Sequence, residues 1–89
     1  MKIWFKEYKK SKMIRDCEIE DNGNETRTHK IFNSLEEASH KLDIAVPIWL
    51  DSNISEFKRS AKTRFSKDSF VEDIDFDFLE MMVTEEDFR

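Results

Sequence analysis

Apolar and charged residues alternate along the first part of the chain, as they do in strands that have one buried face. The alternation runs through Lys2–Tyr8 and returns in Met13–Glu20, and the polar run Lys9–Lys12 lies between them. Two alternating segments joined by a short polar run predict a β-hairpin. The run lacks the Asn-Gly pair that favours a tight turn, so the pattern leaves the register of the two strands open.

The same alternation assigns side chains to the two faces of the hairpin, because successive residues of a strand point to opposite sides. Ile3 and Phe5 are expected on one face. Trp4 and Tyr8 are expected on the other face, among lysines. In the second strand three apolar residues share a face that Arg15 interrupts, namely Met13, Cys17 and Ile19.

A helix is expected beyond the loop 21–26, whose Asp, Asn and Gly residues favour turns. His29–Phe32 is interpreted as a short extended lead into this helix. Two residue pairs can form the capping box at its start, Asn33 with Glu36 or Ser34 with Glu37. Apolar residues at helical spacing then continue, and the helix is expected to end near Asp43.

The apolar segment Ile44–Leu50 contains the only proline, and Pro47 disfavours helical geometry at the residue before it. We interpret this segment as a buried connection. A second cap pair, Asn53 with Glu56, precedes apolar residues at spacings of three and four. They predict an amphipathic helix over Ile54–Phe65, and its basic stretch extends to Lys67.

From Phe70 onward the period changes to two, since Ile74, Phe76 and Phe78 alternate with aspartates. This alternation predicts a strand. At Phe78 the pattern slips by one residue, and Leu79 begins an apolar set on the opposite face, which predicts a β-bulge or coverage on both faces. Residues 84–89 are expected to be a frayed acidic end.

The predicted order β-β-α-α-β indicates an α+β fold, with a small antiparallel three-stranded sheet and two helices on one face. A chain of 89 residues suits a single domain over residues 1–89. The pattern does not place the last strand between the first two or at an edge.

Composition and targeting signals indicate an acidic, folded, cytoplasmic protein. Charged residues make up 39% of the chain, but aromatic residues at 12% provide large side chains for a core. No apolar run is long enough for a signal peptide or a membrane span, so no membrane partner is expected. The lone Cys17 cannot form an internal disulfide, which fits a reducing compartment.

The charges are segregated although the net charge is only -5. Residues 68–87 carry acids and no bases, whereas the helix expected over residues 54–67 ends in a cluster of bases. Such a cluster can bind phosphates and release their counterions, so nucleic-acid binding is the alternative function. Its candidate residues are Lys58, Arg59, Lys62, Arg64 and Lys67.

Catalytic and metal sites are not indicated by residue spacing. The alternating aspartates at 73–77 resemble the start of a calcium loop, but Phe78 and Thr84 stand where glycine and glutamate are required. His29 and His40 lie on different expected elements, and Cys17 on an apolar face is more typical of a small core residue than of a nucleophile. We therefore predict a non-enzyme without cofactor, metal or catalytic residues.

The leading hypothesis is a protein-protein interaction module that binds an unidentified protein or itself, as a homodimer. Trp4 and Tyr8 on the cationic face of the hairpin are candidate contact residues. Trp49 is a third candidate because tryptophan is enriched at interface hot spots, with a core position between helix and sheet as the alternative.

Several short motifs carry a resemblance that extends from Lys2 to Glu86. They are P-I-W-L-D-S-N, E-F-K-R, K-T-R-F and I-D-F-D. With them the chain resembles a group of short uncharacterised bacterial proteins. The resemblance implies no activity, cofactor or site residue.

Overall fold

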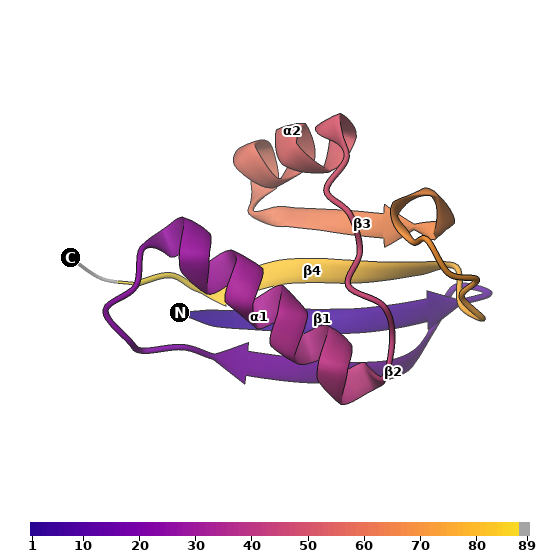
Figure 1. Ribbon diagram of the computed structural model, residues 1–89, viewed down its shortest axis with the longest axis horizontal. Helices are drawn as coiled ribbons and strands as arrows, with labels where there is room; N and C mark the ends of the chain where they lie inside the picture. Colours follow the sequence, from indigo (N-terminus) through magenta and orange to yellow (C-terminus); the bar gives the residue numbers. More distant parts are fainter. Residues whose placement is uncertain (88–89) are drawn as a thin grey trace.

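The computed structural model describes residues 1–87, which form a four-stranded antiparallel sheet and two α-helices (Figure 1). The elements in chain order are β1 (Lys2–Lys9), β2 (Lys12–Glu20), α1 (Arg27–Leu42), α2 (Asp51–Ser60), β3 (Lys62–Ser66), the 3-10 turn η1 (Lys67–Ser69) and β4 (Phe78–Glu85). The strand order is β2-β1-β4-β3. The α+β class with an antiparallel sheet is confirmed, and the expectation of three strands is wrong.

The predicted hairpin is confirmed as the pair β1 and β2. The turn consists of Lys10 and Ser11, and both have positive φ angles, 52° and 66°. Positive φ at both central residues is the geometry of a type I′ turn, whose twist matches that of the flanking strands. A register shift between Glu7 and Tyr8 places Met13 opposite Tyr8, so Met13 no longer shares the face of Cys17.

Helix α1 begins earlier than the capping pairs indicated. Arg27 is its first residue, and the Thr26 side chain accepts a hydrogen bond from the His29 amide at 3.2 Å. The segment His29–Phe32 is therefore helical and not extended. The end of the helix is close to the expected one, because Asp43 caps it in the left-handed conformation with φ of 56°.

The second helix is shorter than its apolar spacing indicated. Ala61 adopts the left-handed conformation with φ of 53° and ends α2, so the following residues form β3 and not further helix. Phe57 and Phe65 match helical spacing, yet one lies on a helix and the other on a strand. Both contact the Trp49 ring edge-on, and this shared contact explains why both are apolar.

The strand expected from Phe70 begins only at Phe78. The preceding residues form a loop in which Phe70 and Phe76 are buried and pack edge-on at 5.8 Å between ring centres. Buried residues of this loop are spaced as they would be in a strand, and this spacing explains why a strand was predicted here. The slip of the pattern at Phe78 marks the start of β4, with Leu79 fully buried, and is not a β-bulge within a longer strand. The register shift between β1 and β4 lies instead beside Lys2 and Ile3. Residues 84–85 belong to β4, and Phe88 and Arg89 lie outside the described residues.

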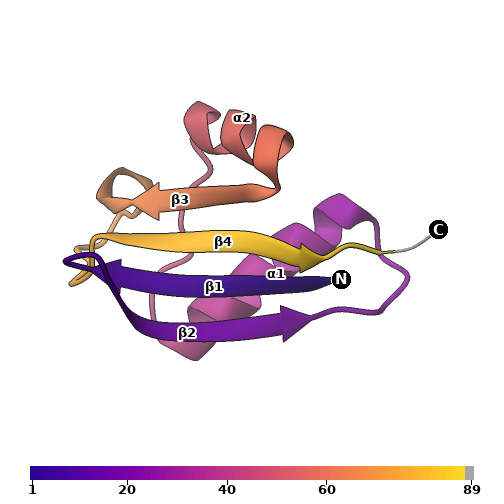
Figure 2. The ribbon, with the colours of Figure 1, turned by 180° about the vertical axis from the view of Figure 1, so that it is seen from behind.

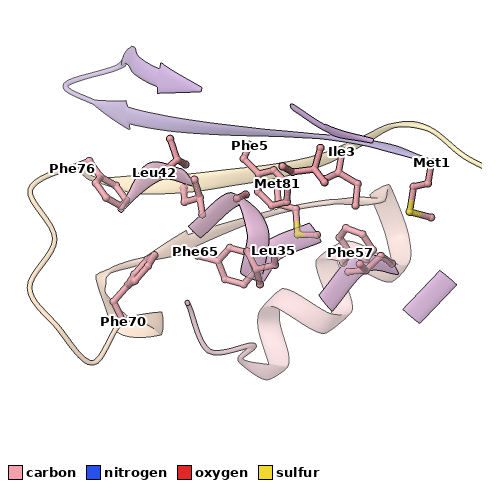
Figure 3. Close-up of a cluster of buried hydrophobic side chains, with 14 residues drawn as sticks. Met1, Ile3, Phe5, Leu35, Leu42, Phe57, Phe65, Phe70, Phe76 and Met81 are labelled. Atoms are coloured by element: carbon pink, nitrogen blue, oxygen red, sulfur yellow. The ribbon is translucent and has the colours of Figure 1, made fainter. Parts of the chain in front are cut away.

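Both helices lie on one face of the sheet, as predicted. Helix α1 crosses β1 and β2, and α2 contacts β3 through Asn53, whose side chain donates to the Thr63 hydroxyl at 2.9 Å (Figure 1). The core between helices and sheet is shown in Figure 3, with Phe5, Leu35 and Met81 near its centre. The opposite face of the sheet carries no helix of the described chain, as Figure 2 shows from behind.

The connection between the helices is only partly buried. Pro47 is buried, but Val46 and Ile48 are about half exposed, at 48% and 52%. The segment is not helical, as expected, but it is buried only in part: Ile44, Ala45 and Trp49 pack against the core, whereas Val46 and Ile48 do not. Among residues 1–87, no helix is long and apolar enough to cross a membrane.

Candidate functional site

The face of the sheet opposite the helices, here called the bare face, is the candidate site. The pairing of the strands aligns its side chains in three rows that cross the sheet from β2 to β3. The Trp4 row consists of Glu18, Trp4, Met82 and Lys62; the Lys6 row of Asp16, Lys6, Glu80 and Arg64; and the Tyr8 row of Met13, Tyr8, Phe78 and Ser66.

Half-buried apolar side chains occupy the middle of this face. Tyr8 and Phe78 stack across β1 and β4 with their ring centres 5.0 Å apart. Trp4 and Met82 are paired on the same two strands and are also half-buried. Since no helix of residues 1–87 covers them, these four side chains present an apolar centre to the surroundings. The prediction that Trp4 and Tyr8 share the face opposite Ile3 is confirmed.

An ion pair lies between these apolar side chains. The Lys6 ammonium is 2.8 Å from a Glu80 carboxylate oxygen, and it lies 4.2 Å from the centre of the Trp4 ring. The other Glu80 oxygen accepts a hydrogen bond from Arg64 at 3.2 Å. Arg64 also lies over the Phe78 ring at 4.6 Å. Charged and aromatic groups therefore form one continuous network across β1, β4 and β3.

The network sets the protonation of its members. Burial disfavours the charge on Lys6, but the hydrogen bond and charge of Glu80 outweigh it and raise the pKa of Lys6 above its ordinary value. Burial likewise opposes ionisation of Glu80, yet the hydrogen bonds from Lys6 and Arg64 leave the pKa of its carboxyl below the ordinary value. Both groups are charged at neutral pH.

The two edges of the bare face carry opposite charge. On β2, Asp16 and Glu18 are exposed, and the Asp16 carboxylate accepts a hydrogen bond from the Trp4 indole at 2.8 Å. On β3, Lys62 and Arg64 are exposed. The face thus has an acidic edge, an apolar centre and a basic edge.

The outer edge of β3 is occupied by side chains of α2. The Arg64 amide donates to the Glu56 carboxylate at 3.1 Å, and the Arg64 carbonyl accepts from the Asn53 side chain at 2.9 Å. Asn53 also accepts from the Leu50 amide at 3.0 Å and so caps the start of α2. The predicted cap pair of Asn53 and Glu56 is wrong, because α2 begins at Asp51 with Leu50 as its N-cap. Asn53 is the third helical residue, and Glu56 binds the edge of β3 instead.

The structure divides the five basic candidates for nucleic-acid binding among three elements. Lys58 and Arg59 lie in the last turn of α2, and Lys67 begins η1. Lys62 and Arg64 lie on β3 and belong to the bare face. The continuous basic helix expected over residues 54–67 is therefore absent, and two of its residues join Trp4 and Tyr8 instead.

Trp49 lies on the helix side of the sheet, away from Trp4 and Tyr8. Its ring is edge-on to Phe32, Phe57 and Phe65, with centre distances of 6.0, 5.4 and 5.1 Å. It is half-buried and packs against the core. Phe32 and Leu50 beside it are exposed, so a second apolar patch lies between the two helices.

The alternation of apolar and polar residues did not identify Glu7, a buried carboxylate near the end of β1 that leads into the hairpin turn. Glu7 is fully buried, and Arg15 binds both of its oxygens at 3.2 and 2.9 Å. Arg15 also donates to the Leu42 carbonyl at 2.8 Å, which joins the hairpin to the end of α1. A cleft of about 750 Å³ opens beside this pair, lined partly by the acidic loop 72–75. The interruption of the apolar face by Arg15 was the only sequence signal of this pair.

The groups considered for catalysis do not form a site. His29 contacts Glu25 at 3.1 Å in the first turn of α1, and His40 lies eleven residues further on, about 16 Å along the helix axis. Burial raises the pKa of the Cys17 thiol, which works against a thiolate nucleophile. Within the described residues, no three His, Cys, Asp or Glu side chains are placed to hold a metal ion.

Comparisons with protein-family models, with curated proteins and with solved structures find no match to this chain. The resemblance to short bacterial proteins stays a prediction. Any functional conclusion therefore depends on the geometry of the bare face.

Proposed function

We propose that this chain is a non-enzymatic, cytoplasmic protein-protein interaction module that binds its partner through the bare face. The observation that carries the proposal is the group of four half-buried apolar side chains at the centre of a sheet face that the chain's own helices leave open. These are Trp4, Tyr8, Phe78 and Met82. A contiguous apolar surface of this kind is typical of interaction sites, because its burial by a partner is favourable.

The distribution of charge supports the same function. Protein interfaces have an apolar, aromatic centre and a polar rim, and the bare face has this anatomy. Asp16 and Glu18 form the rim on β2, and Lys62 and Arg64 form it on β3. Aromatic and arginine side chains, which dominate binding energy in protein interfaces, lie together in the Phe78 and Arg64 contact.

Nucleic-acid binding is supported less well by this arrangement. Single-stranded nucleic acid stacks on exposed aromatics beside free cations. Here Lys6 and Arg64 are both hydrogen-bonded to Glu80, and the exposed acids on β2 would repel phosphates. This alternative is retained as an outcome of the experiment below.

The test is affinity capture from a lysate of the cells that produce the protein, with and without nuclease. We compare the unaltered chain with a Trp4→Ala and Tyr8→Ala double variant. Phe32→Ala serves as the matched control, since Phe32 is an exposed aromatic on the helix side. The fold of each variant is checked by circular dichroism before capture.

We expect a nuclease-resistant protein, which can be the chain itself, to bind the unaltered chain and the Phe32→Ala variant but not the double variant. Binding that survives the double substitution would overturn the assignment to the bare face. Loss of all bound material on nuclease treatment would replace the proposed function by nucleic-acid binding.

A further inference from the structure

We infer that the partner of the bare face is a second copy of this chain, related by a two-fold axis that runs parallel to the strands between β1 and β4. The inference rests on the proposed function, because it names the partner of the same surface. Its basis is the order of charges in each row of the bare face. A dimer of this kind is isologous, so the surface must be complementary to itself.

The Lys6 row shows this self-complementarity most clearly. From β2 to β3 it reads acid, base, acid, base, as Asp16, Lys6, Glu80 and Arg64. A two-fold axis parallel to the strands reverses the order of the row in the second copy. Every acid then faces a base, with Asp16 over the Arg64 position of the second copy and Lys6 over its Glu80 position.

The rows on either side obey the same reversal. In the Trp4 row the ends are Glu18 and Lys62, so each end faces its opposite charge, and Trp4 faces Met82. In the Tyr8 row, Tyr8 faces Phe78. In these two rows the apolar side chains of the two copies therefore meet at the axis, while the charged ends of the Trp4 row meet at the rim. The Lys6 and Glu80 pairs lie at the axis between the two rows.

The other two-fold arrangement of face-to-face sheets is disfavoured by the same residues. An axis in the plane of the face but perpendicular to the strands keeps β2 over β2 and β3 over β3. The acidic edges of the two copies would then lie together, and so would their basic edges. Like charges placed together across an interface are unfavourable, so the charge order selects the first axis.

The size of the face predicts a weak dimer. Strands about 4.8 Å apart and about eight residues long give a face of roughly 500 Å² per copy. A total of about 1,000 Å² lies at the low end for specific interfaces. The match is best near the middle row, because two packed sheets cross at about 30° and the outer rows diverge. Association is therefore expected at micromolar concentrations and above.

The second apolar patch, beside Trp49, lacks the order of charges that would favour the binding of a second copy. Phe32, Ile48, Leu50 and Ile54 are exposed there, but no charge order around them specifies a second copy.

The test is sedimentation equilibrium of the full chain from about 5 µM to about 500 µM, concentrations that span the affinities typical of small interfaces. We compare the unaltered chain with Met82→Lys, which places like charges next to the axis. Val71→Lys is the matched control, because Val71 is 82% exposed on the loop between η1 and β4. We expect a dimer whose dissociation constant rises at least about tenfold in Met82→Lys and stays unchanged in the control.

A charge exchange tests the direction of the axis. Lys62→Glu and Glu18→Lys are each expected to weaken the dimer about threefold to tenfold, since each places like charges at both ends of the Trp4 row. The double variant restores opposite charges and is expected to recover most of the affinity. The affinity of the unaltered dimer is expected to fall as salt is raised.

Three results would overturn the inference. A chain that stays monomeric over the whole concentration range has no second copy as partner, although capture of another protein through Trp4 and Tyr8 would leave the proposed function intact. A dimer insensitive to Met82→Lys uses another surface, such as the patch at Phe32 or the edge of β2. Failure of the double charge variant to recover affinity excludes the axis parallel to the strands.

Discussion

Lys6 and Glu80 form an ion pair with a distance of 2.8 Å, and both side chains are at least nine-tenths buried on a sheet face that no helix of residues 1–87 covers. Their neighbours on the same face bury them, among them the Trp4 ring at 4.2 Å from the Lys6 ammonium. The pair joins β1 to β4, the two central strands of the sheet. It therefore links the first strand of the chain to the last.

Removal of one partner of this pair is expected to destabilise the protein more than replacement of both. Lys6→Met leaves Glu80 buried with only Arg64 as a partner, and a loss of about 3 kcal/mol in the free energy of unfolding is expected. The double variant with Met at both positions leaves no buried charge and should recover at least half of that loss.

Urea unfolding below about 5 µM, where the weak dimer is dissociated, measures these free energies. Lys2→Met provides the control, because its contact with Glu85 at 3.8 Å is more exposed. A double variant no more stable than Lys6→Met would show that the ion pair itself, and not an uncompensated charge, determines stability here.

Ser39→Ala is expected to stabilise the protein by about 1 kcal/mol. Ser39 is fully buried in α1, and its hydroxyl finds no hydrogen-bond partner among the described residues. Replacement by alanine removes an unsatisfied polar group and improves helix propensity. Thermal unfolding measures the gain, and Ser55→Ala on the exposed face of α2 separates the contribution of propensity. A gain no larger than that of Ser55→Ala would mean that the Ser39 hydroxyl is satisfied.

Asp87→Asn is expected to make stability less dependent on pH in acid. The Asp87 carboxylate lies 2.7 Å from both the Lys30 ammonium and the Met1 ammonium. Hydrogen bonds from these groups lower its pKa from 3.8 to about 2. A carboxyl whose pKa is depressed by folding adds stability above its unfolded pKa and loses it as the pH falls.

The contribution of Asp87 is thus complete above about pH 4 and disappears between pH 3.8 and about 2. Melting temperatures of the unaltered chain and the variant should converge across this window. Asp75→Asn, in the exposed acidic loop, is the control and should run parallel to the unaltered chain. A constant difference between Asp87→Asn and the unaltered chain down to pH 2 would contradict this assignment.

Replacement of the hairpin turn Lys10-Ser11 by Asn-Gly is expected to stabilise the chain by about 1 kcal/mol. Both residues have positive φ, which costs side-chain-bearing residues energy that Asn and Gly largely avoid. Differential scanning calorimetry measures the gain. Ser11→Ala keeps the steric penalty and should bring none, so equal melting temperatures for the two variants would refute the explanation.

The hairpin and the faces of its side chains could be predicted because alternation in β1 is regular and one face is buried. Ile3 and Phe5 are fully buried, and Trp4 and Tyr8 lie opposite them. The turn residues could not be placed from the pattern, because neither Lys10 nor Ser11 favours the left-handed conformation that both adopt. Lys10 and Ser11 adopt this conformation because the pairing of β1 with β2 requires a tight turn between the two strands.

The fourth strand could not be predicted because packing overrides local spacing. Phe57 and Phe65 are eight residues apart, a helical spacing, but one lies on a helix and the other on a strand, and both pack edge-on against the Trp49 ring. The break between helix and strand occurs at Ala61, a residue that ordinarily favours helix. Nothing local identified it as a left-handed cap.

The candidate site could be predicted in part. Alternation placed Trp4 and Tyr8 together, but their neighbours Phe78 and Arg64 come from distant segments that only the strand order brings together. The order of charges across the sheet depends on all four strands and therefore has no signature in any single segment.

The side chains of Glu56 and Asn53 at the outer edge of β3 limit how far copies of this sheet can extend one another. They occupy the amide and the carbonyl of Arg64, which an incoming strand would otherwise use. Only β2 has an edge free of such contacts from α2, so edge-to-edge addition can join two sheets and then has no further edge to use. Addition of strands along the sheet edges therefore ends at two copies and does not continue into a fibre.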